Sequence, residues 1–180
     1  MRIIDLTQPL YHHMPVYPGD PEVIVEEIHQ LDREGWNLRQ LQLTTHLGTN
    51  VNVPYHMVAS GKTLDDFEIG VFMGKAKIYQ EGVEYNEQIG LIFHDQNIDR
   101  KLAQILIDKK PKFIGLSEKF EFDLDLEKLL LEHDIISYEN LANTEALPAH
   151  EIFEFCGLPL RIKGGDGSPV RAVVKIDIPY

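Results

Sequence analysis

The middle of the chain alternates twice between a helix pattern and a strand pattern, and this constrains the fold most. Apolar residues at helical spacing, a cap-type start and Pro111 after the end predict a helix over residues 97–109. A buried strand at 113–116, a second helix at 123–131 and a strand at 134–138 follow. Helix followed by strand, twice over, is typical of sheets with parallel strand pairs. We therefore predict an α/β fold with a few helices.

Strand-type runs also precede and follow this middle part. We expect strands at 2–6, 23–28, 38–44, 71–79 and 91–93, a turn at 32–35, and a helical turn at 63–67 capped by Thr63. Near the C-terminus, residues 158–162 and 170–178 flank the turn-rich segment Lys163–Pro169, which predicts a long hairpin. Its three glycines could instead cradle a phosphate, although no helix follows and no lysine is placed as in a P-loop. We find no linker or repeat and predict one domain over residues 1–180.

Composition excludes several classes of partner. The chain of 180 residues carries 29 acidic and 17 basic side chains, a net charge of −12 that disfavours nucleic acid. No apolar run approaches the roughly 18 residues of a membrane span, and no signal-type start is present. The single cysteine, Cys156, lies in an apolar run and is expected to be a buried, inert thiol. We expect a cytoplasmic protein that binds a small molecule, without nucleic acid or membrane partners.

The segment from His46 to His56 contains several side chains that could act in catalysis or bind a metal. Its sequence HLGTNVNVPYH places two histidines ten positions apart around a Gly-Thr pair, two asparagines and a proline. The segment follows the strand expected to end near Thr44, so we predict an irregular, Gly- and Pro-stiffened stretch at a strand end. Functional side chains are often found on such segments.

This stretch resembles the HxGTHxDxPxH motif of the cyclase family, metal-dependent hydrolases that include bacterial kynurenine formamidase and isatin hydrolase. Further resemblance extends over nearly the whole chain. It is carried by the opening residues 4–10, the proline-rich loop 14–21, the Glu-Asn-Leu segment 139–141 and the C-terminal residues 158–172. The resemblance implies a single cyclase-like domain of the swivelling β/β/α type, with mixed β-sheet layers, over residues 1–180.

The resemblance also assigns roles to residues. It makes His46 the first metal ligand, Glu139 a later ligand and His56 the general acid/base. The chain departs from the family pattern at three ligand positions. Asn50 stands where the family has a second histidine, Asn52 where it has an aspartate, and Glu127 where it has a later histidine.

These departures change the metal chemistry that the site can support. An amide oxygen is a weak ligand, and Asn52 cannot bridge two ions as a carboxylate does. Two zinc ions are therefore not expected. One ion, zinc, manganese or magnesium, could still bind to His46, Asn50, Asn52, Glu127 and Glu139, because Glu127 restores the lost negative charge. The alternative is a site without metal, in which these polar groups hydrogen-bond to one another.

Tyr17 and Trp36 are two aromatic residues outside the motif that bear on function. Tyr17 is on the proline-rich loop 14–21, where the resemblance implies that an aromatic side chain lines the substrate site. On composition alone, a surface turn with Tyr17 packed on the core is favoured over a substrate contact. Trp36, the only tryptophan, is expected to pack in the core or at a subunit interface. The resemblance implies a homodimer or a higher homo-oligomer.

Three hypotheses about function follow. The first is a metal-dependent hydrolase of the arylformamidase type, which cleaves a linear or cyclic amide of a small aromatic substrate such as N-formylkynurenine in tryptophan catabolism. The second is a catalytically impaired relative that binds a small molecule or regulates. The third is metal-free hydrolysis of a strained lactam or an ester with His56 as the base. Retained His46, His56 and Glu139 favour an enzyme, whereas Asn50 and Asn52 favour a binding protein.

Overall fold

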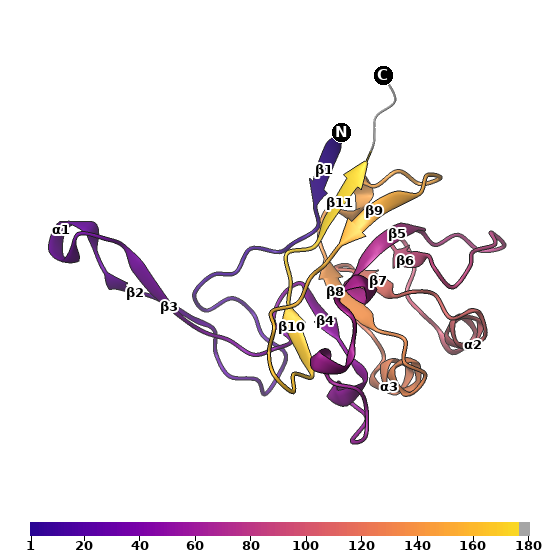
Figure 1. The fold of residues 1–180 in the computed structure, drawn as a ribbon, viewed down its shortest axis with the longest axis horizontal. Helices are drawn as coiled ribbons and strands as arrows, with labels where there is room; N and C mark the ends of the chain where they lie inside the picture. The colour runs from indigo at the N-terminus through magenta and orange to yellow at the C-terminus, as the bar shows by residue number, and fades with distance from the viewer. Residues whose placement is uncertain (177–180) are drawn as a thin grey trace.

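The computed structural model describes residues 1–176, and a nine-stranded mixed sheet forms its centre. Four neighbouring strands run parallel in the order β5 (Met73–Ile78), β6 (Gly90–Phe93), β7 (Ile114–Ser117) and β8 (Ser137–Leu141). The sheet curls strongly across the body of the molecule (Figure 1). The predicted α/β fold with a mixed sheet and few helices is confirmed.

Antiparallel strands extend this parallel centre on both sides. On one side lie β9 (Phe153–Cys156), β11 (Val173–Ile176) and β1 (Arg2–Asp5), so the first and last strands pair directly. On the other side lie β4 (Asn50–Asn52) and then β10 (Gly167–Pro169) at the sheet edge. The sheet therefore brings together segments that are far apart in the sequence.

Two helices cover one face of the parallel strands. Helix α2 (Arg100–Lys109) begins where the Asp99 carboxylate accepts a hydrogen bond of 2.7 Å from the backbone of Leu102. Helix α3 (Leu124–Glu132) is capped in the same way by Asp123. Their apolar faces pack against buried residues of β6 and β7. Both helices lie where the sequence pattern predicted them.

The opposite face of the sheet carries a second apolar core. Its centre is the fully buried Tyr138, whose ring packs edge-on against Phe113 and Phe155. The Tyr138 hydroxyl lies 3.0 Å from the backbone carbonyl oxygens of Phe72 and of Gly157, so its single proton serves two acceptors. Val51 of β4 belongs to the same core. This packing fixes β4 and β8, the two strands that bear candidate site residues.

Short helical turns connect several strands. They are η1 (Pro54–His56), η2 (Leu64–Asp66), η3 (Ile69–Phe72) and η4 (Thr144–Ala146). The predicted cap at Thr63 is present, because the Asp66 carboxylate accepts hydrogen bonds from the backbone and hydroxyl of Thr63. No helix among residues 1–176 is long and apolar enough to cross a membrane.

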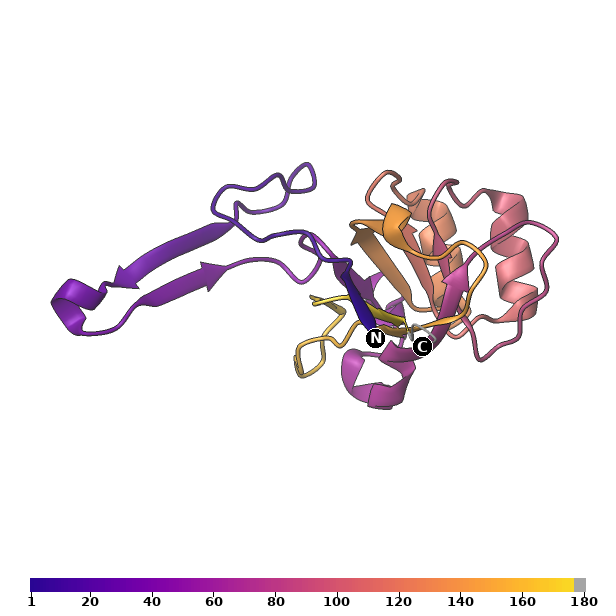
Figure 2. The ribbon, with the colours of Figure 1, turned by 90° about the horizontal axis from the view of Figure 1, so that it is seen from above.

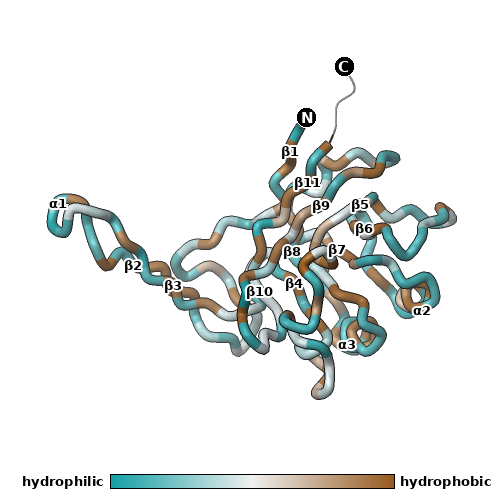
Figure 3. Tube along the Cα trace, viewed as in Figure 1, coloured by the Kyte–Doolittle hydropathy of each residue, from teal (hydrophilic) through white to brown (hydrophobic). Residues whose placement is uncertain are grey.

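A two-stranded arm projects from the body of the molecule. It consists of β2 (Ile24–His29) and β3 (Leu38–Gln42), joined at the tip by α1 (Leu31–Glu34) (Figures 1 and 2). All five residues of β3 are exposed, and the tube in Figure 3 shows apolar segments along the arm as well as in the body. Trp36 is 56% exposed and touches His29 edge-on, so the expectation that it packs in the core of this chain is wrong.

Three local expectations differ from the structure. Residues 158–162 form no strand, and only an isolated bridge joins Pro159 to Val170, so the long C-terminal hairpin is wrong. The strand lies earlier, at β9, where Cys156 is half-buried and not buried as expected. β4 is a true strand inside the stretch that we expected to be irregular. Ile178, the expected end of the last strand, lies outside the described residues.

Candidate active site

His46 and His56 meet because the chain reverses direction between them. After His46, Gly48 adopts a left-handed φ of 56° and leads into β4, and Pro54 then starts the turn η1 that ends at His56. The two imidazole rings stack, with their centroids 3.8 Å apart and their planes tilted by 32°. A separation of ten positions in the sequence thus becomes a direct contact.

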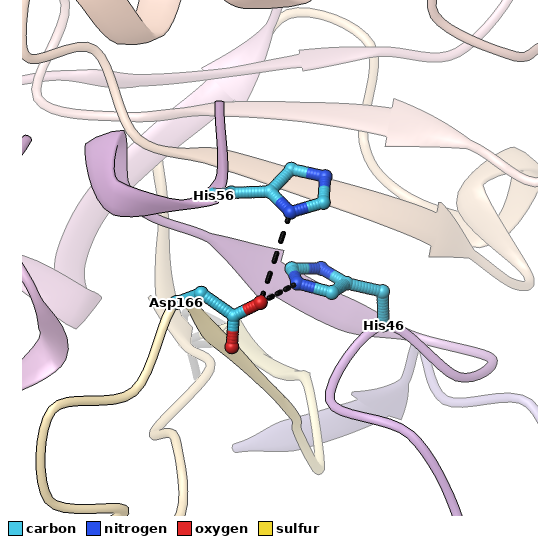
Figure 4. Close-up of side chains that lie close together, drawn as sticks. All are labelled: His46, His56 and Asp166. Atoms are coloured by element: carbon cyan, nitrogen blue, oxygen red, sulfur yellow. Dashed lines mark hydrogen bonds and ion pairs between the residues drawn. The ribbon is translucent and has the colours of Figure 1, made fainter. Parts of the chain in front are cut away.

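Asp166 completes the cluster from the other end of the chain. Its Oδ2 atom lies 2.9 Å from Nε2 of His46 and 3.9 Å from Nδ1 of His56 (Figure 4). Asp166 comes immediately before β10, where Gly167 is paired with Asn52 of β4. A Cβ atom on Gly167 would lie 2.5 Å from Cε1 of His46, so the ring can lie there only because residue 167 is glycine.

Sequence reasoning assigned no role to Asp166. Its only signal was its place between glycines in the segment that resembles the family's C-terminal signature. The sequence pattern of that segment predicts the turn of a hairpin between residues 158–162 and 170–178. Its pairing with β4, which brings Asp166 to His46, is a contact between residues more than 100 positions apart. Local sequence patterns carry no information about such a pairing.

The predicted residues Asn52, Glu127 and Glu139 do lie together, on the other side of His46. Asn52 is fully buried, and its Oδ1 lies 2.7 Å from Nδ1 of His46. Its amide nitrogen donates a hydrogen bond of 3.0 Å to Glu139 and another to Glu127. Ser137 also donates to Glu127, over 3.3 Å. One amide group therefore links a histidine to two carboxylates.

Asn50 lies on β4 directly opposite Glu139 of β8. Its amide nitrogen donates to the backbone carbonyl of Gly48, over 2.9 Å, and its hydrogen bond with Glu139 partly offsets the rise that burial causes in the pKa of that carboxyl. Its buried Oδ1 atom has no hydrogen-bond partner among residues 1–176. Asn140, beside Glu139, has a left-handed φ of 54° and donates to the same Gly48 carbonyl over 3.1 Å. These bonds hold the β4–β8 pair in register behind the site.

Burial and neighbouring charges perturb the pKa values of the site residues. Burial and then the charge of His46 lower the pKa of His56 to about 4, so its imidazole is neutral at pH 7. Burial tends to raise the pKa of Asp166, but the hydrogen bond and charge of His46 outweigh it and lower the value. Burial raises the pKa of Glu139, and burial together with the charge of Glu139 raises that of Glu127 to about 7.

A divalent ion fits beside His46, His56 and Asp166, but not between Glu127 and Glu139. Two imidazole nitrogens and one carboxylate oxygen, from His46, His56 and Asp166, lie within 4.8 Å of one another, and such groups bind divalent metals. The inner carboxylates of Glu127 and Glu139 do not fit an ion in this arrangement. The amide hydrogens of Asn52 already occupy the space between them, and a donor group cannot be a metal ligand.

Tyr17 is 62% exposed, so it does not pack on the core. The proline-rich loop that carries it lies near the cluster, since the charge of Asp20 on this loop acts on the pKa of His56.

The chain is similar to known proteins over nearly its whole length. The Cyclase family model matches residues 4–88, a range that includes His46 and His56. Kynurenine formamidase from Bacillus cereus is 27% identical, over 96% of each chain, and the Salinibacter ruber protein of that name is 28% identical, over 97% of this chain and 98% of that one.

Solved structures show the same fold. Isatin hydrolase A from Labrenzia aggregata superposes with a TM-score of 0.79 at 19% identity, over 96% of this chain and 93% of that chain. A structure described as a potential metal-dependent hydrolase with cyclase activity superposes with a TM-score of 0.76 at 21% identity, over 96% of each chain. In its motif segment, its full-length relatives and its fold, the chain is similar to members of the cyclase family.

Proposed function

We propose that this protein is a hydrolase that cleaves the C–N bond of a small aryl amide, with N-formylkynurenine as the first substrate to test, and that a divalent ion assists it. The observation that carries the proposal is the cluster of His46, His56 and Asp166, in which two imidazoles and a carboxylate converge from three segments. The proposal takes residues 1–180 as one functional unit. The curated relatives named kynurenine formamidase support the reaction class.

In this proposal, His46 and Asp166 hold the ion. A metal binds an imidazole nitrogen along its lone pair, which lies in the plane of the ring. The ring centroids of His46 and His56 lie 3.8 Å apart with a tilt of 32°, and the proposal leaves His56 out of the ligands so that it can transfer protons. His46 Nε2 and Asp166 Oδ2, 2.9 Å apart, can share one ion. When bound, the ion would act as a Lewis acid on the amide carbonyl.

His56 is then free to transfer protons. Its Nδ1 atom lies 3.9 Å from Asp166, too far for a hydrogen bond, so its lone pair can receive a proton. Water adds to the amide carbonyl carbon while Nδ1 of His56 takes a proton from it. The C–N bond then breaks, His56 returns the proton to the leaving amine, and the acyl group departs as a carboxylic acid, which loses its proton to solvent. Its pKa of about 4 makes neutral His56 a weak base toward water and protonated His56 an effective acid toward the leaving amine.

Tyr17 is the proposed contact for the aromatic part of the substrate. Its ring is exposed, and the charge of Asp20 on the same loop reaches His56. An exposed aromatic ring on a loop stiffened by three prolines can stack on a substrate at a low cost in conformational entropy.

We also propose that the protein is a cytoplasmic homodimer and that the arm is part of the dimer interface. A two-stranded ribbon is marginally stable by itself in water. This ribbon exposes Ile28, Leu31, Trp36 and Leu41, each by more than 40% of its surface. A second copy of the chain would cover these residues. Light scattering on wild type and on Trp36→Ser tests the assembly, which the substitution is expected to weaken.

The reaction is tested with N-formylkynurenine and purified protein supplied with manganese or zinc. Release of the free aromatic amine is followed by absorbance. We expect hydrolysis that a chelator stops, and a loss of roughly 10²- to 10⁴-fold in kcat in His56→Gln, the usual contribution of general acid/base catalysis. His133→Gln is the matched control, because His133 is exposed at the end of α3. It should leave kcat unchanged.

Activity that survives the chelator would contradict the role of the ion, and equal losses in His56→Gln and His133→Gln would contradict the role of His56. Absence of hydrolysis of N-formylkynurenine, other aryl formamides and isatin in wild type would contradict the function. A pure binding protein is not favoured, because relatives that match over nearly the whole chain are named as hydrolases.

A further inference from the structure

Asn52 is the starting point, because its amide group has a different kind of neighbour on each side. Its nitrogen faces Glu127 and Glu139, and its oxygen faces Nδ1 of His46 at 2.7 Å. The nitrogen carries two hydrogens and the glutamates offer acceptor oxygens, so each hydrogen has its own carboxylate. Turning the amide over would place its oxygen against two carboxylates. The orientation of Asn52 is therefore fixed by the glutamates.

This orientation determines which nitrogen of His46 carries a hydrogen. The Oδ1 atom of Asn52 can only accept a hydrogen bond, so Nδ1 of His46 must donate it. In the neutral imidazole, Nε2 then has a lone pair and no hydrogen. Hydrogen bonds of this kind, on the nitrogen remote from a metal, commonly orient histidine ligands in proteins.

The bare Nε2 atom lies 2.9 Å from the Asp166 carboxylate. Two lone pairs at this distance repel unless a positive charge lies between them. A proton can provide that charge, and so can a divalent ion bound to both atoms. The buried glutamates thus act through Asn52 to present a ligand atom to Asp166.

We propose that Glu127, Glu139 and Asn52, at positions where the family resemblance implies metal ligands, bind no metal in this chain and instead position His46 for a single cation held with Asp166. The inference rests on the proposed function only for the identity of this cation site. Asn52 takes the place of an inner ion by donating one N–H group to each of the two carboxylates. The chain therefore binds one divalent ion and not two.

Cobalt(II) is a suitable probe, because its visible absorption reports nitrogen and oxygen ligands. Chelator-treated protein is titrated with cobalt, and stoichiometry and affinity are measured by absorption and calorimetry. We expect one cobalt per chain in wild type, and no measurable binding in His46→Ala or Asp166→Asn. Glu127→Gln and Glu139→Gln should bind cobalt within about tenfold of wild type, because a glutamine oxygen still accepts from Asn52. Glu132→Gln, an exposed change on the same helix as Glu127, controls for the lost charge.

Asn52→Leu should weaken cobalt binding by roughly 10- to 100-fold, the usual effect of removing a hydrogen-bond partner of a metal ligand. Because this buried change could prevent folding, the wild-type protein provides a second readout. Nitrogen-15 NMR of the His46 ring in chelator at pH 8 should show the hydrogen on Nδ1.

Three results would overturn the inference. The first is loss of cobalt binding in Glu127→Gln or Glu139→Gln as complete as in Asp166→Asn. The second is a wild-type stoichiometry of zero or two, and the third is an Nε2–H tautomer of His46. Intact cobalt binding by a protein that hydrolyses no amide would contradict the proposed function and leave this inference standing.

Discussion

Gly167→Ala adds one methyl group at the contact between β10 and the candidate site. The new carbon would lie 2.5 Å from Cε1 of His46 and 2.6 Å from the backbone oxygen of Val51. The first contact could be relieved by moving the imidazole, but the second is with the backbone of β4, which pairs with β10. The substitution must therefore separate the two strands, displace His46, or both.

The magnitude follows from two opposing effects. Overpacking of a tight site costs about 1–3 kcal/mol, and the lower entropy of the unfolded alanine chain offsets about 0.4–1 kcal/mol of it. We expect a net loss of roughly 0.5–2.5 kcal/mol, which for a chain of this size lowers Tm by about 1–10 °C. Cobalt affinity should fall as well, because His46 can no longer hold its position.

Chemical denaturation and cobalt titration measure the two effects separately. Gly70→Ala in η3 is the matched control, since a Cβ atom there meets nothing within 4 Å. The control should be as stable as wild type or more stable. If Gly167→Ala keeps wild-type stability and wild-type cobalt affinity, the His46 ring does not lie against residue 167 and the geometry of the site is wrong.

Three further predictions concern stability measured by chemical denaturation. Tyr138→Phe should lose about 0.5–1.5 kcal/mol, because two buried carbonyls lose their shared donor. Asp99→Ala should lose about 1 kcal/mol with the cap of α2. Tyr85→Phe should not destabilise at pH 7, since the buried hydroxyl has no hydrogen-bond partner among residues 1–176. Burial raises the pKa of Tyr85 to about 12 from 10, so wild type should lose stability as pH rises from 10 to 12, and Tyr85→Phe should lose less.

Local signals predicted the helices and the parallel strands. α2 and α3 have carboxylate caps and apolar residues at helical spacing, and both properties depend on neighbours within a few positions. β6 before α2 and β7 between the two helices are mostly apolar, because all their residues are buried. Such elements can be predicted from the sequence because the interactions that form them are local.

The C-terminal region could not be predicted in the same way. Residues 158–162 are apolar enough for a strand, yet the strand is β9, which pairs with β5 and β11. β10 is a strand only because β4 lies beside it, and three residues that include Gly167 and Pro169 have little strand preference of their own. Whether β9 and β10 form strands therefore depends on their pairing with segments that are distant in the sequence.

The same division applies to the candidate site. Resemblance to a motif identified His46, Asn52, Glu127 and Glu139, and the structure brings these four into one hydrogen-bonded group. Asp166 was not predicted as a site residue, because its contact with His46 depends on the β4–β10 pairing. We also propose different roles for Asn52 and the glutamates, since a sequence position does not reveal which way an amide group points.

Because β1 pairs with β11, the sheet can be completed only after its C-terminal strand has been synthesised. The site likewise depends on a late segment of the chain. β1 pairs with β11, and Asp166 meets His46 only when β10 has joined β4. On the ribosome, the first 160 residues can emerge without the partners that complete the sheet and the site, so both are finished only after residues 166–176 have been made. A chain released before residue 166 would hold His46 and His56 but lack the carboxylate between them. Premature termination should therefore give a protein without cation binding, whatever part of the sheet it manages to fold.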